Sequence, residues 1–209
     1  MLAHLSMQEV FQTYLVRERT HKALLSAFAN GHIEQYLELA LGITDPAGNY
    51  SADEHKLGPR ILAMNNQQSI FELARSLYEC SSPGDIPRVI YSHKLSHLKI
   101  SVGSEMAMML RPNDFWVANV RTVWTHLLIR HGDNYDLANE ELQLYRDEER
   151  SSEMDYQIWA EIYLQLEVSL VRLHALGVEE AKQQEVEPGS LKYLWADAIA
   201  TNLYYYRHR

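Results

Sequence analysis

The sequence predicts an all-α protein, a multi-helix bundle of about seven to nine helices. Apolar residues recur at intervals of three and four along most of the 209 residues, as they do on one face of a helix. No segment of useful length alternates apolar and polar residues as a half-buried strand does. A chain of this length can bury a large core, so we expect a single domain over 1–209, with a possible subdomain boundary in the turn-forming segment 81–86.

The first third of the chain predicts three helices separated by a long loop. Ser6 and Glu9 have the spacing of a capping box, and the periodic stretch that follows them stops at Asn30 and Gly31. A short helix is expected over 32–41. Segment 44–59 is rich in turn formers and poor in apolar residues, so it predicts a surface loop. Helical periodicity returns over 60–80, with a possible break at Asn65 and Asn66.

Two apolar helices, at about 95–110 and 114–131, are expected at the centre of the protein. They are separated by the four-residue break 111–114, and together they hold two of the four tryptophans and three of the seven methionines. The second has a broad apolar stripe, and its last turn carries Arg130 and His131 ahead of Gly132, which favours a helix end there. The members of the stripe are Trp116, Val120, Val123, Trp124, Leu127 and Leu128.

The last third predicts an acidic helix over 134–149 and a long helix that Ser151 and Ser152 begin. The stripe of this long helix runs from Met154 to Leu173, and we expect it to stop at Leu176 and Gly177. A short helical turn over 178–184 and a final helix over 190–206 complete the chain.

Composition narrows the classes of function. The net charge of −9 counts against a nucleic-acid binder, because neutralising phosphates needs a basic surface. There is no apolar run long enough to cross a membrane and no signal-peptide pattern, so we expect a soluble cytoplasmic protein. No phosphate loop or other common catalytic motif identifies a cofactor or a reaction.

Glu105 stands out as a candidate catalytic residue because it lies beside the apolar stripe of the first central helix. A carboxylate in that position needs a partner, and Arg111 and Arg121 are the expected ones. Two roles remain open: an ion pair between helices, or an acid that acts in catalysis or ligand binding.

His93 and His97 are the candidate metal ligands. They are four residues apart, so on a helix their rings would share one face. A metal site would need at least one further ligand, and no second motif supplies it. The alternative is a solvated or hydrogen-bonded pair.

Arg121 and His126 are the remaining candidate catalytic residues. Their Arg-x4-His spacing resembles the motif of HEPN-type ribonucleases, although Thr122 stands where a polar amide or acid commonly follows the arginine. The resemblance implies a small all-α ribonuclease. On an unbroken helix the two side chains would be about 140° apart. His126 also belongs to a polar row with Asn119, Thr122 and Arg130, which either lines a cleft or is a solvated helix face.

The final helix is unusually aromatic, with Tyr193, Trp195 and the consecutive Tyr204, Tyr205 and Tyr206. Aromatic residues are enriched at interfaces, so this helix predicts a homo-oligomer or a protein partner, unless it packs into the protein's own core. We therefore expect a non-enzymatic binding or regulatory protein that contacts a protein or a small ligand. The alternative is a hydrolase, metal-dependent or acid–base, that uses Glu105, Arg121 and His126 or the histidine pair.

Overall fold

The structure is a computed structural model that describes residues 1–146 and 151–208. Over these residues it has eleven α-helices, two short 3₁₀ helices and no strand, which confirms the all-α prediction. The number of α-helices exceeds the expected seven to nine, because the expected loop contains helical turns and the possible break at Asn65 and Asn66 does divide 60–80 into two helices.

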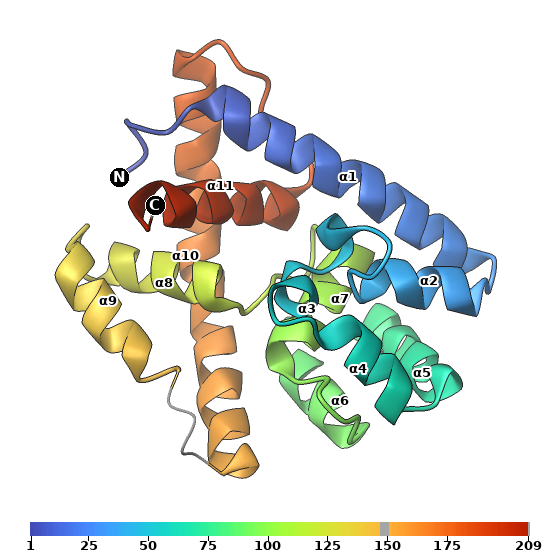
Figure 1. Cartoon of the computed structure of the whole chain (residues 1–209). Coiled ribbons are helices and arrows are strands. Elements are labelled where there is room, and N and C mark those ends of the chain that lie inside the picture. Colours follow the sequence, from blue (N-terminus) through green and yellow to red (C-terminus); the bar gives the residue numbers. More distant parts are fainter. Residues whose placement is uncertain (147–150, 209) are drawn as a thin grey trace. The chain divides into compact units, whose positions relative to one another are not determined.

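The chain divides into two compact units. Unit 1 is formed by Met1–Leu15 and Ala118–Arg209, and unit 2 by Val16–Val117. The segment 81–86, the expected subdomain boundary, lies inside unit 2, and the single-domain organisation stays a prediction. In chain order the α-helices are α1 (Met7–Ala29), α2 (Ile33–Ala40), α3 (Tyr50–Glu54), α4 (Leu57–Met64), α5 (Gln67–Glu79), α6 (Ile86–Ser92), α7 (Ile100–Leu110), α8 (Val120–Arg130), α9 (Tyr135–Gln143), α10 (Ser152–Gln183) and α11 (Lys192–Arg207) (Figure 1).

Helix α7 is the core helix of unit 2. All its residues except Ser101 are buried, and it packs against α3, α5 and α6. It starts at Ile100, five residues later than expected, because Lys94 and His97 adopt the left-handed backbone conformation. A residue in that conformation interrupts a helix, so the chain between α6 and α7 turns instead of winding.

Helix α8 is the core helix of unit 1. Every residue from Arg121 to Leu128 is buried, and the helix packs against α9, α10 and α11. It begins at Val120, not at 114, because Asn119 is extended and forms a reciprocal capping box with Thr122. Its end follows the prediction, with Arg130 in the last turn and Gly132 in the left-handed conformation just beyond it.

The expectation of a surface loop over 44–59 is wrong. The segment contains a 3₁₀ helix (Pro46–Gly48), helix α3 and the start of α4, and several of its residues are buried. The Asp45 side chain caps the 3₁₀ helix and the Asn49 side chain caps α3. Aspartate and asparagine can end one turn and begin the next in this way, so residues typical of loops here produce short, buried helical turns.

The expected helix end at Leu176 and Gly177 is also wrong, because α10 continues to Gln183 (Figure 1). Gly177 is buried inside the helix, and a β-carbon at that position would overlap the Ile199 side chain of α11. The glycine therefore permits α11 to pack closely. Helix α9 ends at Gln143, and residues 147–149 of the expected helix over 134–149 lie outside the described residues.

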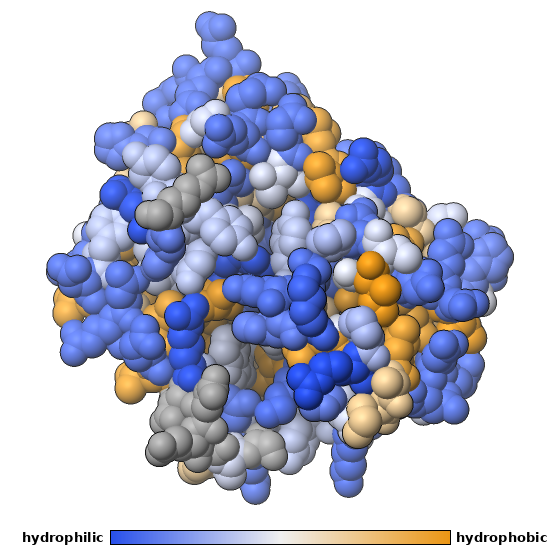
Figure 2. Space-filling model, viewed as in Figure 1, coloured by the Kyte–Doolittle hydropathy of each residue, from blue (hydrophilic) through white to orange (hydrophobic). Residues whose placement is uncertain are grey.

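The apolar side chains are mostly buried, and the face drawn in Figure 2 is mainly hydrophilic with separate hydrophobic areas. Across the described part of the chain, no helix combines the length and apolar character that a membrane span needs.

Candidate functional site

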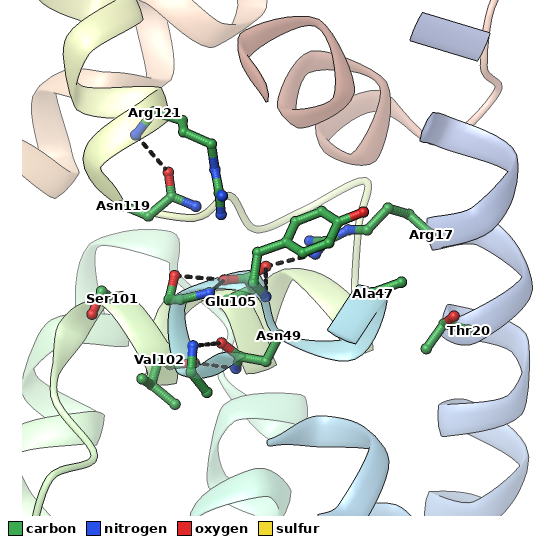
Figure 3. Close-up of polar contacts among 12 residues, drawn as sticks. Arg17, Thr20, Ala47, Asn49, Ser101, Val102, Glu105, Asn119 and Arg121 are labelled. Atoms are coloured by element: carbon green, nitrogen blue, oxygen red, sulfur yellow. Dashed lines mark hydrogen bonds and ion pairs between the residues drawn. The ribbon is translucent and has the colours of Figure 1, made fainter. Parts of the chain in front are cut away.

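Glu105 lies in the interior of unit 2 and is completely buried. Its Oε1 accepts hydrogen bonds from Arg17 Nη1 at 2.6 Å and from the Tyr50 backbone N–H at 2.9 Å. Its Oε2 accepts from the backbone N–H and the hydroxyl of Ser51, at 2.9 and 2.6 Å (Figure 3). Four donors from α1 and α3 thus surround one carboxylate on α7, so the charge is balanced and hydrogen-bonded within the unit.

Arg17 is a partner that sequence reasoning did not name, since Arg111 and Arg121 were the expected ones. Its side chain is completely buried, and its guanidinium lies 4.5 Å from the centre of the Tyr50 ring. A signal was present in the sequence, because Arg17 follows Val10 and Tyr14 at helical spacing and therefore falls on the buried stripe of α1. Arg111 instead binds Asp114 and the backbone carbonyls of Tyr78 and Cys80.

Short polar contacts hold the donors of Glu105 in place. The Asn49 side chain accepts from the Ala52 N–H and donates to the carbonyl oxygens of Ala40 and Val102, so it joins α3 to α2 and α7 (Figure 3). Thr20 of α1 donates to Asp45 at 2.6 Å. This cluster connects four elements of unit 2 through buried hydrogen bonds, which suits a role in holding the unit together.

Arg121 and His126 lie on the unbroken helix α8 and contact different helices. Arg121 is buried and donates to the Tyr205 hydroxyl of α11 at 3.3 Å. His126 contacts Ser169 of α10. Both belong to unit 1, whereas Glu105 belongs to unit 2. The polar row is not a solvated face, because Asn119, Thr122 and His126 are buried and only its last member, Arg130, is exposed.

The contact between His126 and Ser169 places a hydroxyl group beside a base. His126 Nδ1 lies 2.8 Å from Ser169 Oγ, and both residues are more than nine-tenths buried. Burial, with a smaller contribution from the charge of Arg130, lowers the pKa of His126 below its usual 6.5. The imidazole is therefore neutral at pH 7, the form that can accept a proton from a hydroxyl. Its Nε2 has no hydrogen-bond partner among the described residues.

His93 and His97 do not share a helix face. His93 ends α6 and lies 3.2 Å from Ser76 Oγ, whereas His97 is exposed in the turn before α7. The helical spacing argument for a shared metal therefore fails. In residues 1–146 and 151–208, no group of three or more histidine, cysteine, aspartate or glutamate side chains is placed to hold a metal ion.

The aromatic last helix is divided between core and surface. Tyr193 and Trp195 are buried, and the Trp195 ring packs edge-on against Tyr14 at 5.8 Å between ring centres. Tyr205 and Tyr206 are about half exposed. Most of α11 therefore belongs to the core of unit 1, and the aromatic surface available to a partner is confined to its end.

An aligned set of exposed apolar residues lies on α10 in unit 1. Leu164, Val168 and Val171 have exposed fractions of 53%, 78% and 40%. Ala175, which is exposed, and Val178, which is half-buried, continue the same spacing. We call these five residues the α10 stripe. The opposite face of the helix packs against α8 and α11 with its buried residues Ile162, Leu166, Leu170 and Leu173. Helix α10 thus has two apolar faces, of which one is uncovered.

Comparisons with known proteins add no functional assignment: no family model matches the chain, and no curated protein or solved structure matches it significantly.

Proposed function

We propose that this protein acts by binding a protein partner through the α10 stripe. The observation that carries the proposal is the alignment of Leu164, Val168 and Val171 on one uncovered face of α10. A single exposed apolar residue is ordinary on a protein surface. A row of them along several helical turns is typical of an interaction surface, because covering it removes apolar area from water.

The polar surroundings of the stripe support the same function. Glu161 and Lys182 stand at its two ends, and both are exposed. An apolar centre with a charged rim is the usual composition of a protein interface. The proposal keeps the expectation of a soluble cytoplasmic protein, and it moves the predicted binding surface from the aromatic helix α11 to its neighbour α10.

Site-specific photo-crosslinking tests this function. A photoreactive phenylalanine derivative replaces Val168 in cells that express the chain, and the same derivative replaces Leu137 as a control. Leu137 is 45% exposed and also lies in unit 1, on α9. We expect a discrete protein adduct from position 168 and none of comparable yield from position 137. Equal yields at the two positions, or no adduct at position 168, would show that the stripe is not a binding surface.

Hydrolysis is a second candidate function, and the contact between His126 and Ser169 favours it. A serine hydroxyl within hydrogen-bond distance of a neutral imidazole is the pairing of nucleophile and base that covalent catalysis uses. Treatment with a fluorophosphonate, followed by mass spectrometry, tests whether Ser169 is nucleophilic. We expect an adduct on Ser169 that is lost in His126→Ala. A protein that stays unmodified, or is modified equally in the variant, would exclude this function.

A further inference from the structure

We propose that the partner of the α10 stripe is a second copy of this chain, bound as a parallel two-stranded coiled coil. This inference rests on the proposed function, because it requires the stripe to be a binding surface. The stripe residues follow one another at intervals of four, three, four and three. This is the heptad spacing that keeps one face of a helix against a supercoiled partner.

The identities of the residues suit two identical helices. With Val168 and Ala175 at the a positions, Leu164, Val171 and Val178 fall at the d positions. Val168 at a beside Leu164 at d is the combination that favours two strands, and the small Ala175 at a permits close approach. The stripe spans about 21 Å at the rise of an α-helix, and the helix is already folded within unit 1. Pairing therefore requires no new secondary structure.

The charges beside the stripe select the parallel orientation. In this register Glu167 is at a g position and Arg172 at the following e position. A g residue of one parallel helix faces the e residue five positions later on the other. Glu167 of each copy would thus face Arg172 of the other copy. The dimer would contain two such ion pairs, one on each side of the seam. An antiparallel pair brings g against g and e against e, so the Glu167–Arg172 pairs are lost.

Both flanking residues are free to make this contact. Glu167 and Arg172 are exposed, and neither lies on the face of α10 that packs within unit 1. The contact is limited to about two heptads, because exposed charged residues take the next positions of the spacing at both ends. These residues are Glu161 and Lys182. An interface of this size is at the small end for protein complexes, so we expect a reversible dimer and not a permanent one.

The first test is self-association of the purified, tag-free chain in analytical ultracentrifugation. We expect a monomer–dimer equilibrium that Val168→Glu weakens at least tenfold, because two glutamates would face each other at the seam. Glu167→Arg and Arg172→Glu should each weaken the dimer roughly fivefold, since each change places like charges at both flanking contacts. The double variant should regain the wild-type affinity. Arg88→Glu, an equal change of charge on the exposed surface of unit 2, should leave the affinity unchanged.

The second test is oxidative cross-linking of Leu164→Cys in a Cys80→Ser background. In a parallel dimer the two copies of residue 164 face each other across the seam, so a disulfide should form rapidly. In an antiparallel dimer centred on the stripe they are far apart. A strict monomer, or a dimer that neither charge reversal weakens and that does not cross-link at 164, would overturn the inference. A photo-adduct between position 168 and a different protein would then leave the proposed function standing. Thermal unfolding of Val168→Glu serves as the folding control.

Discussion

Replacing Glu105 by glutamine should destabilise unit 2 by about 3–5 kcal/mol. Both oxygens of the carboxylate accept hydrogen bonds from α1 and α3, and one of the donors is the buried guanidinium of Arg17. The amide of glutamine keeps one acceptor oxygen and turns an NH₂ group toward two former donors. Arg17 also loses its counter-charge. Removal of one partner from a buried ion pair typically costs this much, because the other charge remains buried.

Urea unfolding followed by circular dichroism measures this loss. For a chain of this length the same change lowers the unfolding temperature by roughly 6–20 °C. If the two units unfold in separate transitions, the loss belongs to the transition of unit 2. Asp85→Asn is the matched control, because Asp85 pairs with Arg88 on the surface, where an ion pair contributes about 0–1 kcal/mol. A Glu105→Gln variant within about 1 kcal/mol of the wild type would refute the assignment of a structural ion pair.

Three further results are expected. Elemental analysis should find the same metal content in the wild type and in His93→Ala/His97→Ala, because the two rings lie in a turn and do not share a helix face; a near-stoichiometric metal that the variant loses would contradict this. Gly177→Ala should lower the unfolding temperature, because the added methyl group would overlap Ile199. The free energy of unfolding should fall as pH is lowered from 7.5 to 5.5, and His126→Gln should reduce that slope. Burial lowers the folded-state pKa of His126, so the unfolded chain binds its proton first, and one such group contributes up to about 1.4 kcal/mol per pH unit. An unchanged slope would argue against a neutral buried His126.

The helices that carry the cores were predictable from the sequence, because their apolar residues repeat with helical period. Helices α7 and α8 both lie within the predicted segments and are almost entirely buried. Their starts were not predictable from apolar pattern alone. The start of α8 depends on the cap that Asn119 provides, and the start of α7 on the backbone conformation of residues such as His97.

Gly177 and Asn49 explain why the predicted helix end at 176–177 and the predicted surface loop over 44–59 were wrong. Gly177 has the sequence appearance of a helix end, yet it is inside α10 because a neighbouring helix approaches it closely. Asn49 has the appearance of a loop residue, yet its side chain is buried and joins three helices. In both cases the residue type is explained by a neighbour distant in sequence, which no local pattern contains.

For the same reason, only one member of the buried ion pair, Glu105, was predicted from the sequence. A carboxylate beside an apolar stripe identified Glu105 as a residue that needs a partner. The partner, Arg17, lies 88 residues earlier in the chain. Its own position on the buried face of α1 was visible, so two unexplained charges on two buried faces could have been matched. The pairing of His126 with Ser169 had no equivalent signal, because serine is common on either face of a helix.

Because of how the chain is divided, the two units can complete their folding at different stages of synthesis. Unit 2 is a continuous segment, whereas unit 1 needs residues from both ends: the Met7 N–H donates to Gln184, 177 residues later, and the Tyr14 hydroxyl accepts from the N–H of Ser190 and Leu191. At about 5–20 residues per second, a ribosome takes roughly 9–35 s to make the chain between Met7 and Gln184. Unit 2 can therefore fold while the first half of α1 still waits for α10 and α11. During that interval Val10 and Tyr14 are exposed to water or to a chaperone. A pause in translation after Val117 has left the ribosome would prolong their exposure without affecting unit 2.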